Sequence, residues 1–347
     1  MINRRRFSQA FAAVVATASV AGCAAPPETA PAASAAAGTS PTLVPVGPSK
    51  NAFGPLKQVN AGVLNIGYAE SGPADGPVVI CLHGWPYDIQ SYVDVAPLLA
   101  AAGYRVIVPY LRGYGTTRFL AADTFRNGQQ AVVALDIIAL MDALKIEKAV
   151  LAGFDWGART AGVLAALWPQ RCKALVSVSG YLITSLKANL QPLPPRAELG
   201  WWYQYYFSTE RGVLGYTQNR HDFNKLIWKI VSPRWNFDDT TYDRTAASFD
   251  NPDHVAVVIH NYRWRLSLAK GDPRYDGLEA QLEAAPVITV PTITIGSDFD
   301  GAAASGEGYR KQFSGPYSHR VFTGIGHNVP QEAPQEFAKA VMDADHS

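Results

Sequence analysis

Short, unbroken apolar runs recur along the chain and constrain its fold more than any other feature. A strand that is covered on both faces of a parallel sheet has such a continuous run, whereas a half-exposed strand alternates. Helical patterns fill most of the intervals, and this alternation predicts an α/β fold with a mainly parallel sheet and helices on both faces. The runs lie at residues 78–82, 105–108, 149–152, 174–178 and 292–295, and the helical patterns at residues 89–101, 127–144 and 158–167.

Shorter patterns extend this core at both ends. A hairpin is expected near the start, because Asn60, Ala61 and Gly62 stand between two β-like segments. After the last apolar run, helical and strand patterns alternate once more. These further segments lie at residues 56–59 and 63–69 (strands), 308–313 (helix), 320–323 (strand) and 333–342 (helix).

Residues 181–285 interrupt this rhythm. The stretch is rich in Trp, Tyr, Phe and Arg, and no buried strands separate its helical segments. A helical insertion in a parallel sheet predicts a cap over the carboxyl edge of the sheet, where open α/β folds place their sites. The expected cap helices lie at residues 199–207, 213–228 and 252–269, which leaves residues 51–180 and 286–347 as the two parts of the core.

The first fifty residues have the composition of an export leader followed by a tether. Residues 1–23 carry Arg4 and Arg5 ahead of a weakly apolar run, which resembles a twin-arginine signal peptide. Small residues stand directly before Cys23 and resemble a lipoprotein cleavage box, so Cys23 is the expected lipidation site. Residues 24–50 are mostly Ala, Pro, Ser and Thr and are expected to form a disordered tether. We therefore expect a periplasmic or cell-envelope lipoprotein that touches the membrane only through this anchor.

The charge balance bears on the kind of partner. The formal net charge is +1 and becomes about −2 without Arg4, Arg5 and Arg6, so no basic excess is available for nucleic acid. A small neutral organic substrate is the expectation. The three cysteines have no metal-ligand spacing, and we expect neither a metal nor a cofactor. The sequence does not determine the oligomeric state.

The sharpest local motif is Gly153-Phe154-Asp155-Trp156-Gly157, which follows one apolar run and precedes a helical pattern. Glycines on both sides of one polar residue at a strand-to-helix turn are typical of a nucleophile elbow. A carboxylate in the central position can attack saturated carbon and form an alkyl-enzyme ester. We therefore predict that Asp155 is a nucleophile. The alternative is an aspartate that only caps the following helix.

A base and an orienting acid are expected on the last two loops of the core. His327 lies close to glycines on the loop after the last strand, where an imidazole can take a proton from water. The acid should follow the strand at residues 292–295, where Asp298 and Asp300 are both available. Asp298 lies closer to the end of that strand, but the sequence leaves the choice open.

These motifs resemble those of one protein family. His83-Gly84-Trp85-Pro86, Asp155-Trp156-Gly157 and His327 are similar to the motifs of the epoxide hydrolase and haloalkane dehalogenase branch of the α/β-hydrolases. The resemblance extends from about residue 53 to the C-terminus and implies an α/β-hydrolase fold with a cap. The order of nucleophile, acid and histidine along the chain is the one that this fold uses.

The resemblance implies roles for further residues. Backbone N–H groups of Trp85 and Trp156 would form an oxyanion hole. Tyr203 and Tyr262 of the cap would donate hydrogen bonds to the oxygen of an epoxide. A count from Pro291, by analogy with relatives, favours Asp300 as the acid. The remaining substrate-binding candidates are His83, Trp202, Tyr206 and Trp264, although His83 could instead hold its own loop.

Three functions remain open at this point. The residues imply the opening of an epoxide to a diol through an ester on Asp155, with His327 activating water. A haloalkane dehalogenase could use the same triad, although Trp85 stands where such enzymes commonly have a halide-binding asparagine. A second halide donor could then be a cap tryptophan such as Trp201, Trp202 or Trp264. The third possibility is a non-catalytic protein that uses the cap and core as a ligand pocket.

Overall fold

The computed structural model describes residues 42–347. The predicted signal peptide (residues 1–23), with Cys23, and residues 24–41 of the predicted tether lie outside the described residues. The described part contains one nine-stranded sheet in the order β1-β2-β4-β3-β6-β7-β8-β9, with β5 paired to β2. The strands are β1 (Lys57–Ala61), β2 (Leu64–Ser71), β3 (Val78–Leu82), β4 (Arg105–Pro109), β5 (Arg118–Phe119), β6 (Ala149–Gly153), β7 (Cys172–Val178), β8 (Thr292–Ser297) and β9 (Tyr317–Phe322).

The sheet is mainly parallel, as the apolar runs predict. Strands β4, β3, β6, β7, β8 and β9 pair in parallel, whereas β2 pairs antiparallel with both β1 and β4. β3 lies between β4 and β6, so the strand order reverses at β3. A reversal of this kind opens a crevice at the carboxyl ends of the strands.

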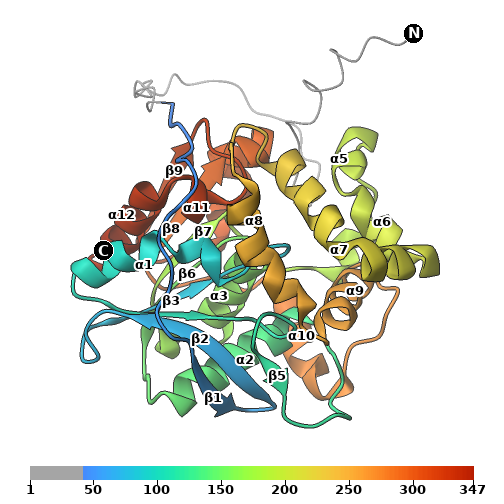
Figure 1. Cartoon of the computed structure of the whole chain (residues 1–347), viewed down its shortest axis with the longest axis horizontal. Helices are drawn as coiled ribbons and strands as arrows, with labels where there is room; N and C mark the ends of the chain where they lie inside the picture. The colour runs from blue at the N-terminus through green and yellow to red at the C-terminus, as the bar shows by residue number, and fades with distance from the viewer. Residues whose placement is uncertain (1–41) are drawn as a thin grey trace, which may run out of the picture.

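Helices cover both faces of the sheet (Figure 1). On one face α1 (Val95–Ala101) packs against α12 (Pro334–Asp345), and on the other α2 (Gln130–Ala143) packs against α3 (Trp156–Leu167). All residues of β6 are buried, and most residues of α3 are buried and small. Small side chains let α3 approach the sheet closely, which fixes the start of α3 relative to the end of β6.

The cap is inserted between β7 and β8 and consists of helices, as expected. Figure 1 shows α5, α6, α7 and α9 together on one side of the molecule. The helices α8 and α10 were not expected, because their sequences are short and largely polar and carry no clear apolar stripe. The cap helices are α4 (Leu186–Asn189), α5 (Pro195–Gly200), α6 (Trp202–Ser208), α7 (Glu210–Val231), α8 (Asp239–Ala246), α9 (His254–Arg265) and α10 (Asp276–Glu283).

Some expected boundaries are wrong. Asn60 and Ala61 belong to β1 and pair with β2, so the hairpin turn consists of Gly62 and Val63. A two-residue turn suits this hairpin because Gly62 has a φ of 56°, which a glycine adopts readily. The helix expected at residues 89–101 is divided into a 3-10 helix, η2 (Ile89–Tyr92), and α1. The segment expected as a helix at 308–313 is also a 3-10 helix, η7 (Glu307–Gln312), and it is followed by α11 (Val329–Glu332) after β9.

Residues 42–50 correct the prediction of a disordered tether. They form neither helix nor strand, but they are hydrogen-bonded to the core and to the cap. Val46 donates its N–H to the carbonyl oxygen of Glu332 (2.9 Å), and the indole of Trp235 donates to the carbonyl of Val46 (3.1 Å). Figure 1 shows this blue segment crossing the front of the molecule beside α11. Leu43 also packs against the core, and an extended segment can be held by its backbone, so the Pro- and Ser-containing composition was misleading.

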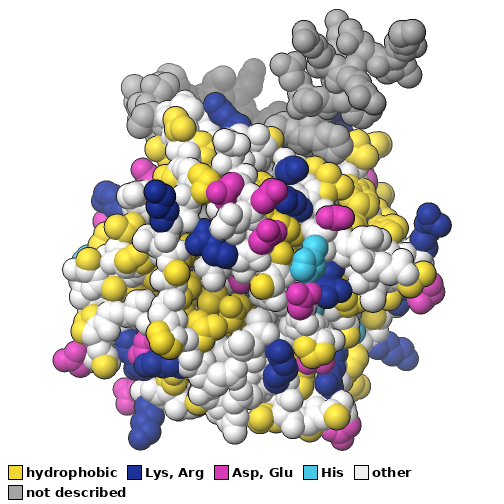
Figure 2. All heavy atoms as spheres, in the orientation of Figure 1, with side chains coloured by type: hydrophobic (Ala, Val, Ile, Leu, Met, Phe, Trp, Pro, Cys, Tyr) yellow, Lys and Arg dark blue, Asp and Glu magenta, His cyan; other side chains and the backbone are white. Residues whose placement is uncertain are grey.

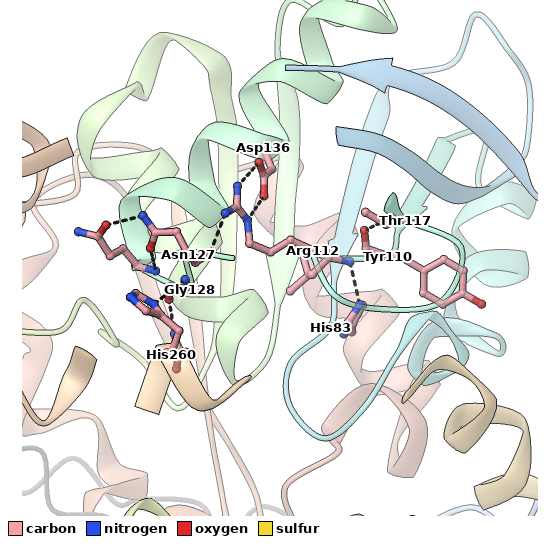
Figure 3. Close-up of polar contacts among 11 residues, drawn as sticks. His83, Tyr110, Arg112, Thr117, Asn127, Gly128, Asp136 and His260 are labelled. Carbon is pink, nitrogen blue, oxygen red and sulfur yellow. Dashed lines mark hydrogen bonds and ion pairs between the residues drawn. The ribbon is translucent and has the colours of Figure 1, made fainter. Parts of the chain in front are cut away.

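A buried polar network holds the loop between β4 and α2 (Figure 3). The guanidinium of Arg112 donates to both carboxylate oxygens of Asp136 (2.6 and 2.7 Å) and to the carbonyl of Asn127 (2.7 Å). The neighbouring Leu111 donates its N–H to Nε2 of His83 (3.1 Å). The network therefore fixes this loop against the loop that follows β3.

The visible surface is mixed in charge. On the face drawn in Figure 2, basic and acidic side chains are interspersed and form no continuous basic stripe. Among residues 42–347, no helix has the length and apolar character needed to cross a membrane.

Candidate active site

The carboxyl ends of four parallel strands carry the predicted catalytic residues. β3 leads to Trp85, β6 to Asp155, β8 to Asp300 and β9 to His327. These strands belong to the parallel part of the sheet, so they end at the same edge. Residues that are far apart in the sequence therefore meet in one place.

Asp155 occupies a sharp turn between β6 and α3. Its φ of 53° and ψ of −125° lie in a region that residues other than glycine rarely adopt. Gly157 allows the close approach of α3 to β3, because a Cβ at this position would lie 1.8 Å from the carbonyl oxygen of Leu82. The side chain of Asp155 makes no bond that caps α3. The alternative of a simple helix cap therefore has no support in the geometry.

Two backbone amides face the carboxylate of Asp155. The N–H of Trp85 donates to Oδ1 at 2.8 Å, and the N–H of Trp156 lies close enough to help lower the pKa of the carboxylate. Gly84 makes this approach possible, because a Cβ there would lie 2.3 Å from Oδ1. The two amides expected to form an oxyanion hole are thus brought to the predicted nucleophile.

His327 lies on the other side of the same carboxylate. Its Nε2 is 3.4 Å from Oδ2 of Asp155. Burial raises the pKa of Asp155, but the hydrogen bond and charge of His327, together with the charge of Arg159, outweigh burial and leave this pKa below its usual value. Asp155 is therefore ionised near neutral pH, which is the state a nucleophilic carboxylate needs.

The two candidate acids lie in different environments. Asp300 is buried, and its Oδ2 accepts the N–H of Ser297 at 2.8 Å. Burial raises the pKa of Asp300, against hydrogen bonds and the charge of His327 that lower it. Asp298 is partly exposed and pairs with Arg234 at 3.4 Å. Within the described chain Nδ1 of His327 has no hydrogen-bond partner, so no direct bond to the base identifies the acid. Asp300 is favoured because it is buried and because the charge of His327 acts on its pKa.

Tyr203 of α6 and Tyr262 of α9 meet above this carboxylate. Both side chains are buried, and their ring centroids are 5.4 Å apart. The ring of Trp85 packs against both, at 4.9 and 5.2 Å. Burial is the main cause that raises the pKa of each phenol, followed by the negative charge of Asp155 at Tyr203, and by Tyr203 and then Asp155 at Tyr262. Both hydroxyl groups therefore keep their protons near neutral pH and can donate hydrogen bonds.

The other cap aromatics divide into two groups. Trp202 and Tyr206 of α6 pack on Phe223 at 5.3 and 5.9 Å, and Phe223 also contacts the tryptophan of the oxyanion loop. Trp264 follows Tyr262 by two residues on α9, and consecutive helical residues are about 100° apart, so its side chain points away from the site. No ring contact within residues 42–347 joins Trp264 to this cluster, and its predicted substrate-binding role has no support.

His83 is held by its own surroundings. It is fully buried, its Nδ1 lies 3.1 Å from the carbonyl oxygen of Gly84, and its Nε2 accepts the N–H of Leu111. Burial lowers the pKa of His83 to about 4, which keeps it neutral with Nδ1 as the donor. The prediction that His83 binds substrate is therefore corrected. Its two nitrogens fix the oxyanion loop, and neither is free for a ligand.

A chain of hydrogen bonds, which we did not expect, orients Trp85. Its indole N–H donates to the hydroxyl of Tyr216 (2.8 Å), which lies 2.9 Å from Nε2 of His254. Nδ1 of His254 lies 3.0 Å from the carbonyl of Gly113, and burial lowers the pKa of His254 to about 3. With His254 neutral, the indole of Trp85 donates to the hydroxyl of Tyr216, this hydroxyl donates to Nε2 of His254, and the Nδ1–H of His254 donates to the carbonyl of Gly113. The sequence offered no local signal, because these residues are far apart along the chain.

Glu332 and Ser232 are two further residues that the sequence analysis missed. Both are buried, and they join the loop of His327 to the end of α7. A possible signal was the position of an acidic residue only five places after His327. Within the described residues, no group of three or more His, Cys, Asp or Glu side chains could hold a metal ion.

Comparisons with known proteins agree with this geometry. A model of the alpha/beta hydrolase fold matches residues 77–214. The protein YfhM of Bacillus subtilis, of the AB hydrolase superfamily, is 33% identical over 215 residues, which cover 61% of this chain and 73% of YfhM. The chain therefore belongs to the α/β-hydrolase family, and the predicted fold is confirmed.

Within that family the chain is epoxide-hydrolase-like in sequence and structure. Epoxide hydrolase B of Mycobacterium tuberculosis is 32% identical over 160 residues, 42% of this chain, but the match spans only 44% of that protein. A solved structure of a presumed epoxide hydrolase from Klebsiella pneumoniae is 60% identical, with a TM-score of 0.83, and the match covers 84% of this chain and 97% of that one.

Proposed function

We propose that the protein hydrolyses epoxides to vicinal diols through an ester formed on Asp155. One observation carries this proposal: the ionised carboxylate of Asp155 interacts electrostatically with two buried, protonated phenols, those of Tyr203 and Tyr262, whose rings are 5.4 Å apart and which hydrogen-bond to each other. An epoxide needs such donors because its oxygen becomes an alkoxide when the ring opens. A halide departs as a stable anion and has less need of a pair of hydroxyl donors.

In the first step, Asp155 attacks one carbon of the epoxide. Oδ1 is bound by the amide of Trp85, so Oδ2 is the oxygen that would form the new C–O bond. The ring C–O bond breaks, and its electron pair goes to the epoxide oxygen. Tyr203 and Tyr262 stabilise that oxygen and protonate it, which leaves a hydroxyalkyl ester.

In the second step, water attacks the carbonyl carbon of the ester. His327 takes a proton from this water, and the amides of Trp85 and Trp156 stabilise the negative charge that develops on Oδ1. Collapse of the tetrahedral intermediate breaks the bond to the diol oxygen. The protons taken from water return to that oxygen and to the cap phenol, so the sum of both steps is epoxide plus water giving diol.

The covalent ester gives a direct test. Asp155→Ala should abolish turnover, because the nucleophile is lost. His327→Gln should still form the ester but hydrolyse it slowly, so intact-protein mass spectrometry after incubation with styrene oxide should show the mass of one epoxide added. His221→Gln is the matched control: this partly exposed cap histidine pairs with Asp250, and the variant should turn over normally without an adduct. Absence of both diol and adduct with a panel of epoxides would refute the proposal.

Haloalkane dehalogenation is the second candidate, and one feature favours it. The indole N–H of Trp156 is buried beside the hydroxyl of Tyr262, the one polar group of residues 42–347 that interacts with it, so a departing halide could take the place of that hydroxyl as its acceptor. Halide release from matched 1-haloalkanes, compared with diol formation from the corresponding epoxides, separates the two functions. A binding protein without catalysis would produce neither halide nor diol.

A further inference from the structure

Glu332 is a buried carboxylate that the proposed steps do not use. It ends α11, is fully buried, and accepts three hydrogen bonds. Oε2 accepts the N–H of Gly326 at 2.7 Å, and Oε1 accepts the N–H of Asn328 at 3.1 Å and the hydroxyl of Ser232 at 2.6 Å. Three donors converge on this one side chain.

These donors enclose the predicted base. Gly326 and Asn328 are the immediate neighbours of His327 in the chain. The third donor, Ser232, in turn accepts the backbone N–H of His327 at 3.0 Å, which this N–H shares with the carbonyl oxygen of Val231 at 3.2 Å. The carboxylate of Glu332 thereby ties down three consecutive amides, two directly and one through a hydroxyl. The imidazole itself has one polar partner, Asp155 at 3.4 Å from Nε2, while Nδ1 is without a partner in the described chain, so these backbone bonds add to a sparse set of side-chain contacts.

Glu332 also joins three parts of the molecule. Ser232 directly follows α7 of the cap, and the carbonyl of Glu332 accepts the N–H of Val46 from the N-terminal segment. α11 itself belongs to the core. The loop of His327 is therefore positioned at the point where core, cap and N-terminal segment meet, beside α11 in Figure 1.

The ionised form of Glu332 suits this arrangement. A neutral carboxyl group carries a proton on one oxygen, and that oxygen then faces an N–H or O–H donor with another hydrogen. Burial raises the pKa of Glu332, while the bonds from Ser232, Gly326 and Asn328 and the charge of His327 oppose this rise. Three carboxylates, those of Asp155, Asp300 and Glu332, thus interact electrostatically with His327.

We propose that Glu332 is a positioning residue that holds His327 in place for the hydrolysis of the ester. This inference rests on the proposed function. Formation of the ester needs Asp155 and the cap phenols, whereas only its hydrolysis needs the imidazole. Loss of the Glu332 contacts should therefore slow the second step and leave the first largely unchanged.

The test measures the two steps separately. Glu332→Gln replaces one acceptor oxygen by an NH₂ group, which must face an N–H or O–H donor. In rapid-quench experiments with styrene oxide, the rate of ester formation should stay within about threefold of the wild type, and ester hydrolysis should slow about 10- to 100-fold, the range expected for a misplaced catalytic group. The ester should then accumulate in the steady state, and KM should fall together with kcat.

Two further variants keep the test decisive. Ser232→Ala removes only the hydroxyl link and should also slow hydrolysis selectively. Glu279→Gln is the control, because Glu279 is another hydrogen-bonded, partly buried carboxylate, but it bonds to Gln130 and Ala131 at the start of α2. Both rates should be normal in that variant.

The outcomes distinguish the two proposals. Normal ester hydrolysis in folded Glu332→Gln overturns the positioning role, and so does normal hydrolysis in Ser232→Ala if Glu332→Gln fails to fold. In either case the wild-type enzyme still makes diol. An equal loss in both steps also overturns it, because a general loss of structure then explains the effect. If neither the wild type nor His327→Gln reacts with epoxides, the proposed function itself fails.

Discussion

The surroundings of His327 shift the pKa values of individual carboxylates in different directions. The pKa of Asp155 is lowered because bonds and charges of His327 and Arg159 outweigh burial, whereas burial dominates at Asp300 and raises its pKa. Opposite shifts in neighbouring acids commonly accompany different chemical roles. Here they suit an ionised nucleophile and an acid sheltered behind the base.

The hydroxyl groups of the cap tyrosines can be tested one at a time. Tyr203→Phe and Tyr262→Phe each remove a donor to the epoxide oxygen and keep the ring that packs on Trp85. We expect each variant to lower the rate of ester formation by roughly 10²–10³-fold, as the loss of one donor to a developing oxyanion does. Single-turnover measurement of ester formation gives the result.

A neighbouring tyrosine provides the control for that experiment. Tyr205 lies on the same helix but is exposed, and its hydroxyl bonds to Glu198. Tyr205→Phe should leave ester formation unchanged. If Tyr203→Phe or Tyr262→Phe reacts as fast as the wild type, that hydroxyl is not a donor to the substrate.

At the scale of elements, the loop between β4 and α2 links the oxyanion loop to the cap. Beyond the Arg112 network, Gly128 donates its N–H to Nδ1 of His260, and its carbonyl accepts the side-chain amide of Asn261 (Figure 3). Both partners lie on α9, the helix that carries Tyr262. The placement of one cap phenol therefore depends on a loop of the core.

The buried ion pair in this network makes a stability prediction. Asp136→Ala would leave the guanidinium of Arg112, only 2% exposed, without its carboxylate. Because an unpaired buried charge is costly, the free energy of unfolding should fall by about 3–5 kcal/mol, measured by urea denaturation. The exposed pair of Lys225 and Asp239 is the comparison, and Asp239→Ala should leave stability nearly unchanged, because an ion pair in contact with water contributes little. Equal effects of the two variants would contradict this account.

At the scale of the whole molecule, buried carboxyl groups couple stability to pH. Burial raises the pKa of Asp88 to about 7 and that of Glu279 to about 7. In the unfolded chain such groups titrate near 4. Between these values the folded protein holds protons on these two groups that the unfolded chain releases, so their contribution to stability falls as the pH rises from about 4 to 7 and then levels off, whereas the buried neutral His83 and His254 contribute in the opposite direction.

Asp88 allows this coupling to be measured. Its Oδ1 accepts the N–H of Gln90 and the hydroxyl of Thr245, both at 2.9 Å, and an asparagine oxygen can accept the same two bonds. Because folded Asp88 keeps its proton at pH 5 and releases it by pH 8, Asp88→Asn should gain on the order of 2 kcal/mol of stability relative to the wild type between these two pH values. Denaturant unfolding at both pH values measures the difference. Asp142→Asn, at an exposed position, should match the wild type, and identical pH dependence in Asp88→Asn would contradict the prediction.

The sequence by itself determined the mainly parallel sheet, the helical cap and the turn at Asp155. These features depend on neighbours in the chain: a strand buried on both faces must be apolar throughout, and a tight strand-to-helix turn must have small flanking residues. The same local patterns predict the signal peptide and the lipidation of Cys23, and these remain predictions because they lie outside residues 42–347.

The tertiary structure decided what depends on distant partners. It gave His83 a place in a hydrogen-bonded loop, separated buried Asp300 from partly exposed Asp298, and ordered residues 42–50 against the core and cap. It also joined Glu332 to Ser232, which is 100 positions away in the chain and links the loop of His327 to the cap. Burial and hydrogen-bond partners of this kind arise when the chain is folded, so no local pattern can encode them.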